Sequence, residues 1–150
     1  MSRPVVVVEP GQGHRVGNVE FLARTEDTPF FNLAIVVLRP GQGVESHRHN
    51  VEDDSFLVLD GTLSLTVGDN DRDVQAGPGT FVLVPAGTAH AIVNSGATDV
   101  RFLNVHAPGG FDRRIGLGRA ASTSGTSGAS AAGSGRALAT SPSAPHSGID

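Results

Sequence analysis

Several residue types that commonly carry enzyme chemistry are missing from this chain. It has no cysteine, which excludes disulfide bonds, thiolate metal ligands and a cysteine nucleophile. It has no lysine either, so no side-chain amine can form a Schiff base. Tyrosine and tryptophan are also absent, which removes a phenolic acid or base. Any catalysis must therefore depend on histidine, aspartate and glutamate, with or without a metal ion.

Length and charge restrict the remaining options. A chain of 150 residues suits one domain and is long enough to bury a core. The net charge of -4 argues against a nucleic-acid partner, because neutralising phosphates requires clustered cationic side chains. The amino terminus has no basic segment followed by an apolar leader, and Val5–Val8 is too short to cross a membrane. We therefore expect a cytoplasmic protein without a membrane partner.

Short β-branched and apolar runs alternate with turn residues along the first two thirds of the chain. The candidate strands are Val5–Val8, Val19–Arg24, Asn32–Arg39, Val44–His49, Ser55–Leu59, Thr62–Val67, Arg72–Gln75, Thr80–Val84, His90–Val93 and Val100–His106. Nearly every gap between them contains Gly, Pro, Asn or Asp, which favour turns. No window repeats with the period of about 3.6 residues that marks an amphipathic helix. Many short strands at regular spacing predict an all-β sandwich or barrel.

The composition changes after Gly116. Residues 117–150 are mostly Gly, Ser, Ala, Thr and Pro, without an aromatic side chain. Such a segment buries too little apolar surface to offset the entropy lost on ordering. We therefore predict a folded domain at residues 1–116 and a disordered, low-complexity tail at 117–150. His146 lies in this tail and is expected to have no function.

Histidine and acidic residues gather in two separate stretches. His47 and His49 are two residues apart in a predicted strand, where their side chains share one face with Cα atoms roughly 6.6 Å apart. Two imidazoles at this separation can bind one divalent ion. Acidic residues follow directly, and His90 lies in the second stretch. A closed barrel is needed to bring the two stretches together.

Both stretches resemble the paired motifs of the cupin superfamily, and the resemblance covers roughly residues 30–106. The first motif has its spaced positions at Gly41, His47, His49, Asp54 and Gly61. The second has its positions at Gly79, Pro85, Gly87, His90 and Asn94. The resemblance implies a double-stranded β-helix of the jelly-roll type. It also implies a metal inside the barrel, bound by the residues at positions 47, 49, 54 and 90.

The acidic ligand departs from the family pattern, because Asp54 stands where cupins have glutamate. Aspartate is one methylene shorter, which leaves three arrangements open. Asp54 binds after a small backbone shift, Glu52 replaces it, or the three histidines bind alone. Alternation along an extended strand puts Glu52 and Asp54 on the same face. The spacing to Gly61 favours Asp54.

Several other residues are expected to have structural roles. The candidates to line or pack the barrel are Phe56, Val58, Leu63, Leu65, Phe81, Leu83, Ile92, Phe102 and Leu103. His106 is expected to form hydrogen bonds at the barrel end rather than bind metal, and Asn94 to form a turn. Surface positions are expected for His14, Glu45, Arg101, Arg113 and Arg114, although an arginine at the barrel mouth could pair with an anionic substrate.

The ligand set suits Fe(II), Mn(II), Ni(II), Cu(II) or Zn(II) and leaves coordination positions open. The resemblance implies a metal-dependent enzyme acting on a small organic molecule, most often a dioxygenase-type oxidoreductase with an enolic or aromatic substrate. Glu52 is the candidate catalytic base that takes the substrate proton. The alternatives are a non-oxidative isomerase, cyclase or lyase, or a ligand-binding cupin without catalysis. The resemblance also implies a homodimer, with Val5–Val8 as the exchanged strand.

Overall fold

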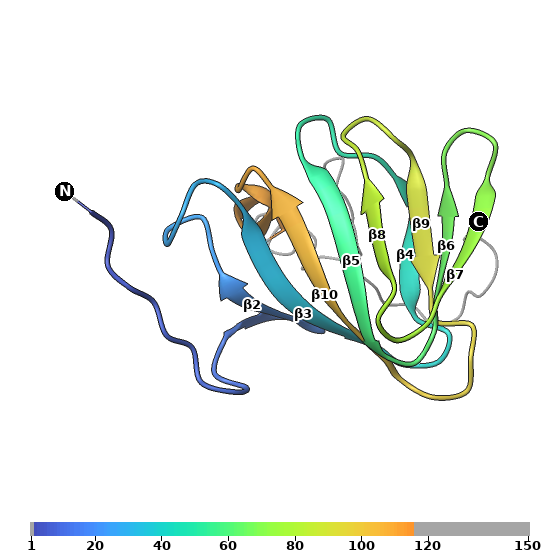
Figure 1. The fold of residues 1–150 in the computed structure, drawn as a ribbon, viewed down its shortest axis with the longest axis horizontal. Helices are drawn as coiled ribbons and strands as arrows, with labels where there is room; N and C mark the ends of the chain where they lie inside the picture. Colours follow the sequence, from blue (N-terminus) through green and yellow to red (C-terminus); the bar gives the residue numbers. More distant parts are fainter. Residues whose placement is uncertain (1, 116–150) are drawn as a thin grey trace, which may run out of the picture.

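The computed structural model describes residues 2–115. The predicted tail and His146 lie outside the described residues. Within that range the strands are β1 (His14–Val16), β2 (Val19–Ala23), β3 (Asn32–Leu38), β4 (Gly43–His47), β5 (Asp53–Asp60), β6 (Leu63–Val67), β7 (Arg72–Ala76), β8 (Phe81–Val84), β9 (His90–Val93) and β10 (Val100–Ala107) (Figure 1). A short helix at residues 111–115 follows β10.

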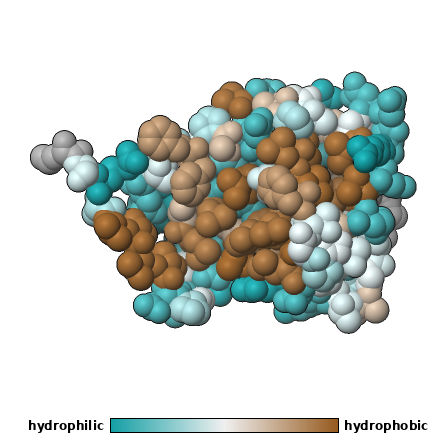
Figure 2. Space-filling view, viewed as in Figure 1, coloured by the Kyte–Doolittle hydropathy of each residue, from teal (hydrophilic) through white to brown (hydrophobic). Residues whose placement is uncertain are grey.

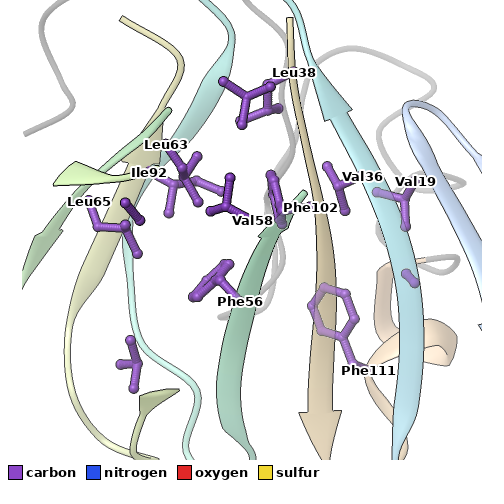
Figure 3. Close-up of a cluster of buried hydrophobic side chains, with 14 of the residues drawn as sticks. Val19, Val36, Leu38, Phe56, Val58, Leu63, Leu65, Ile92, Phe102 and Phe111 are labelled. Carbon is purple, nitrogen blue, oxygen red and sulfur yellow. The ribbon is translucent and has the colours of Figure 1, made fainter. Parts of the chain in front are cut away.

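The strands form two antiparallel sheets that enclose one core. The larger sheet has the strand order β1-β2-β3-β10-β5-β8, and the smaller has the order β4-β9-β6-β7. Figure 3 shows Leu63 and Ile92 of the smaller sheet pointing toward Val58 and Phe102 of the larger one. The all-β prediction is confirmed, and two facing antiparallel sheets are the arrangement of a jelly roll.

Side-chain alternation along the strands decides which residues enter the core. In β3, Ala34, Val36 and Leu38 are buried while the residues between them are half-buried. The same alternation buries Val100 and Phe102 in β10. Most of the predicted core is buried as expected, namely Phe56, Val58, Leu63, Leu65, Ile92 and Phe102.

Three predicted core residues point outward instead. Phe81 is 59% exposed and Leu83 is 52% exposed, whereas Val84 is buried. Successive side chains of a strand point to opposite faces, so Val84 takes the inward position of β8 and its apolar neighbour Leu83 takes the outward one. In β10 the inward position belongs to Phe102, which leaves Leu103 half-buried on the outer face.

The predicted N-terminal strand Val5–Val8 does not form within the single chain. The segment runs away from the barrel (Figure 1), and Val5 is 90% exposed. Four β-branched residues favour an extended backbone, but a strand also needs a partner for its backbone hydrogen bonds. No described strand pairs with this segment. Sequence analysis also missed β1, which forms a small hairpin with β2.

Two boundaries near the barrel end differ from the prediction as well. The predicted strand Val44–His49 is too long, because β4 ends at His47 and its register with β9 shifts before that residue. The helix at 111–115 was not predicted, since five residues are too few to show a helical repeat. Its Phe111 and Ile115 are buried. No helix in the described range is long and apolar enough to cross a membrane.

A motif glycine and an asparagine hold two of the turns that position the strands. Gly61 has a φ of +79°, and a Cβ there would lie 2.5 Å from the carbonyl oxygen of Asp99. Both features require glycine. The buried Asn94 side chain donates hydrogen bonds to the carbonyls of Leu38 and Thr98, each at 2.8 Å. Asn94 is therefore a turn former, as predicted.

The buried side chain of Phe102 allows a test of how much the core contributes to stability. Phe102 is 1% exposed and its ring centroid lies 5.7 Å from that of Phe56. Phe102→Ala should lower the free energy of unfolding by about 3–5 kcal/mol, because the cavity adds to the lost burial. Urea denaturation measures the difference. The neighbouring Arg101→Ala, on the exposed face, should change stability by about 0.5 kcal/mol or less, and equal losses for the two variants would contradict the assignment of faces.

Candidate metal centre

Three histidines and one aspartate meet at one end of the barrel. The ligand atoms of His47, His49, Asp54 and His90 all lie within 4.8 Å of one another. His47 ends β4, His90 begins β9, and the two residues are direct partners across these strands. Asp54 comes from β5 in the other sheet. The structure thus brings together all four ligands that sequence analysis predicted.

Hydrogen bonds between the two motif loops fix the position of His49 beyond the end of β4. The N–H of Gly87 donates to the carbonyl of His49 at 2.7 Å. The Arg48 guanidinium donates to the carbonyl of Gly87 at 3.0 Å. In the same turn, the N–H of Ala86 donates to the Asp53 carboxylate at 2.9 Å. His49 therefore faces the cluster because the loop is held, and not because it continues the strand.

The tautomers of two histidines follow from their backbone partners. Nδ1 of His47 lies 2.8 Å from the carbonyl oxygen of Glu45, and Nδ1 of His90 lies 3.0 Å from that of Thr88. A carbonyl oxygen only accepts hydrogen bonds, so each Nδ1 carries the proton. Nε2 of His47 then has a free lone pair, whereas Nε2 of His90 lies 2.9 Å from Asp54 Oδ2. A metal-bound histidine commonly has such an outer hydrogen bond to a backbone carbonyl.

His49 lacks the hydrogen bonds that its burial demands. It is 3% exposed, and neither ring nitrogen has a hydrogen-bond partner. Its Nε2 lies 3.2 Å from Asp54 Oδ2. A buried polar atom without a partner costs about 1–3 kcal/mol. A metal ion at Nε2 would remove part of this cost, so the residues present fit a metal.

Asp54 is held from several sides. Its Oδ2 lies 2.9 Å from Nε2 of His90. Its Oδ1 accepts a hydrogen bond from the Asn104 amide at 2.6 Å and lies 3.4 Å from Nε2 of His106. Of the three arrangements left open by the sequence, the structure has the one with Asp54 in the cluster.

The protonation states of the cluster favour metal binding. Loss of hydration, together with the neighbouring His90, lowers the pKa of the half-buried His47 to about 3. Burial also lowers the pKa of His49, although Asp54 opposes the change. For Asp54, burial raises the pKa, but the nearby imidazoles of His106, His49 and His90 outweigh burial and hold the pKa of the carboxylate well below its ordinary value. Metals bind neutral imidazole and ionised carboxylate, and at neutral pH these are the forms of His47, His49 and Asp54.

Glu52 lies beside the cluster but is not part of it. It is 2% exposed, and its Oε1 is 3.9 Å from Nδ1 of His49. Its Oε2 accepts a hydrogen bond from Nη2 of Arg114 in the helix at 111–115. The candidate base therefore has a cationic partner that sequence analysis did not identify.

His106 and Asn104 complete the polar end of the barrel. His106 is buried, lies 3.4 Å from Asp54 Oδ1 through its Nε2, and is outside the group of four candidate ligands. Its ring stacks on Phe111 with centroids 3.7 Å apart. Asn104 was missed, although it shares the inward face of β10 with Phe102 and His106. The other predicted surface residues His14, Glu45, Arg101 and Arg113 are exposed.

Comparisons with known proteins agree with this geometry. The cupin-domain family model matches residues 34–106. An oxalate-binding protein of Thermotoga maritima is 35% identical over 73 residues, which cover 49% of this chain and 59% of that protein. The crystal structure of a predicted oxalate decarboxylase from the same organism has a TM-score of 0.59 and 26% identity, covering 70% of this chain and 99% of the other.

A Klebsiella pneumoniae protein of unknown function with a double-stranded β-helix domain has a TM-score of 0.54 and 24% identity. The match covers 68% of this chain and 84% of the other. The chain spans less than two thirds of the length of the curated relatives it matches. The family match includes all four residues of the candidate metal centre. With the two motifs and the two facing sheets, these similarities place the chain in the cupin superfamily.

Proposed function

We propose that this cupin binds one divalent transition metal and uses it to hold a small organic molecule through two oxygen atoms. The convergence of His47, His49, Asp54 and His90 is the observation that carries this proposal. Three nitrogen donors and one oxygen donor suit Fe, Mn, Ni, Cu or Zn. Four protein ligands leave room for substrate on a metal that accepts six donors.

Within this site we propose a dioxygenase-type oxidation of an enolic or aromatic substrate. A bound redox metal would supply Lewis acidity and a place where substrate and dioxygen meet. Both oxygen atoms enter the organic product, so no external reductant is needed. Phe56 and Phe111 lie 6.2 Å and 5.6 Å from the nearest ligand imidazoles, measured between ring centroids. These apolar rings would exclude water and contact a planar substrate.

Glu52 is the residue that we propose to accept the substrate proton. Its carboxylate is buried beside the cluster, with Oε1 3.9 Å from Nδ1 of His49. A positioned carboxylate of this kind can contribute about 10²–10⁴-fold to the rate of a proton transfer. Its burial keeps it from competing solvent.

The Thermotoga maritima oxalate-binding protein supports a second candidate function. Oxalate, like an enolate, presents two oxygen atoms to a metal. The same centre would therefore serve a protein that binds a small acid without oxidising it, or a non-oxidative isomerase, cyclase or lyase. Turnover in the absence of dioxygen would identify a non-oxidative isomerase, cyclase or lyase.

A homodimer is the assembly that we propose. Apolar side chains gather on the outer face of the larger sheet, as Figure 2 shows. Phe81 and Leu83 project there from the edge strand β8. Apolar patches of this kind usually mark an interface, and pairing one face with the same face of a second copy would bury both. Val5–Val8, which pairs with no described strand, would gain a strand partner in the same contact.

The cytoplasmic location stays a prediction.

Metal content tests the centre. The protein as isolated, or after metal addition, should hold about one transition-metal ion per chain. Changes to the outer hydrogen bonds of a metal ligand typically lower metal affinity by about 10–100-fold. His90→Ala should lower metal affinity further, because it removes a direct ligand. Elemental analysis after gel filtration measures the ratio. His14→Ala, at an exposed histidine, should leave it unchanged, and a folded His90→Ala protein with full metal content would refute the site.

Oxygen consumption tests the reaction. Protein loaded anaerobically with Fe(II) should consume dioxygen in the presence of a flavonol, a catechol or a 1,3-diketone, as measured with an oxygen electrode. Glu52→Gln should retain the metal and reduce the rate by about 10²–10⁴-fold. No uptake with any substrate of the panel, together with oxalate-induced spectral changes, would favour the binding protein over the dioxygenase.

Solution mass tests the assembly. Light scattering after size exclusion should give twice the mass of one chain. The variant Phe81→Glu with Leu83→Glu should be monomeric, because charges placed on both copies of the face would repel and lose hydration. Val51→Glu is the matched control, since Val51 is 65% exposed in the loop before β5. A wild-type monomer at all concentrations would exclude the dimer.

A further inference from the structure

The Glu52–Arg114 pair has an asymmetry that the proposed reaction does not explain. Glu52 is almost fully buried, whereas the Arg114 side chain is 37% exposed. The guanidinium uses Nη2 for Glu52 and has further N–H donors in the same plane. A single carboxylate separates Arg114 from the ring of His49, because Glu52 Oε1 lies 3.9 Å from His49 Nδ1. Arg114 is thus a partly open cation at the edge of the candidate metal centre.

Arg114 is held in this place by the packing of its helix. The Asp112 carboxylate accepts hydrogen bonds from the backbone N–H of Thr25 at 3.0 Å and from its hydroxyl at 2.5 Å. Phe111 stacks on His106, and the Arg114 guanidinium lies 5.9 Å from the Phe111 ring centroid. A cation fixed in advance loses less entropy when it binds a ligand.

The charges around the site favour an anion. A divalent ion would be offset by the carboxylates of Asp54 and Glu52, and the remaining unit of positive charge comes from Arg114. Among the nearby arginines of the described chain, Arg48 is turned toward the Gly87 carbonyl and Asp69, and Arg113 is exposed. Arg114 is therefore the cation that gives the loaded centre a net attraction for one negative charge.

We propose that Arg114 is the specificity-determining residue for substrate, and that the substrate is an organic anion. Its carboxylate or enolate oxygen would bind the guanidinium beside the oxygens held by the metal. In the absence of substrate, the Glu52 carboxylate pairs with the Arg114 guanidinium. It therefore competes with an incoming anion for that guanidinium. The inference rests on the proposed metal centre and adds the chemical class of the ligand. Arginine suits this task because its planar donors match a carboxylate.

Anion binding to the cobalt-loaded protein tests this role. Co(II) gives a visible spectrum that changes when a ligand enters its coordination sphere, and oxalate is the probe. Arg114→Gln should weaken oxalate binding by about 10–100-fold, since hydrogen bonds to charged groups are the stronger class. Arg114→Lys should recover part of the loss. Arg113→Gln, which removes the same charge one residue away, should bind oxalate as the wild type does.

Glu52→Gln separates anion recognition from a structural role. If Glu52 competes for the guanidinium, this variant should bind oxalate more tightly than the wild type. If Arg114 only neutralises a buried carboxylate, the gain in oxalate affinity from Glu52→Gln should persist when Arg114 is also replaced by Gln. The double variant Glu52→Gln with Arg114→Gln leaves no unpaired buried charge and should bind oxalate as weakly as Arg114→Gln.

Imidazole provides the neutral control ligand at pH 8. It should bind the cobalt of the wild type and of Arg114→Gln equally, because it carries no charge for Arg114 to recognise. Equal loss of imidazole and oxalate binding in Arg114→Gln would overturn the inference, as would oxalate binding at wild-type strength. Failure of the wild type to take up cobalt would instead refute the metal centre, and this inference with it.

Discussion

The buried carboxylate of Asp54 is the constraint on which the polar end of this barrel depends. Removing a charge from water is costly unless partners replace the hydration. Asp54 is 3% exposed, and its partners come from three segments: His49 after β4, His90 in β9 and Asn104 in β10. Its position therefore requires that both sheets and the first motif loop close correctly around it. Folding and site assembly are one event at this end of the molecule.

The inward faces of the strands change character along their length. In β10 they pass from Val100 and Phe102 to Asn104 and His106. In β5 the apolar Phe56 follows the charged Asp54 on the same face. The barrel interior is therefore divided into an apolar part that supplies stability and a polar part that contains the candidate metal centre. Strand pairing fixes the boundary, because Phe56 is opposite Asn104 in the register of β5 and β10.

Local pattern was sufficient to predict most strands, and the resemblance of two short stretches to the cupin motifs was sufficient to predict all four residues of the cluster. Local pattern could not predict features that depend on distant partners. Glu52 and Arg114 are 62 residues apart in the chain, and nothing near either residue indicates the pair. Val5–Val8 has the composition of a strand, but its described surroundings provide no partner. Asn104 could have been found by extending the alternation of Phe102 along β10.

The shorter acid at position 54 is explained by what lies behind it. One oxygen of Asp54 is turned toward Asn104 and His106, and the other faces His49 and His90. The carboxylate is thus oriented before any metal arrives, and one oxygen remains directed at the three imidazoles. A glutamate would carry its carboxylate one methylene further from β5. It would enter space close to the histidine rings and lose contact with Asn104. In this barrel, Asn104 and His106 of β10 hold the carboxylate of the shorter Asp54 side chain in position.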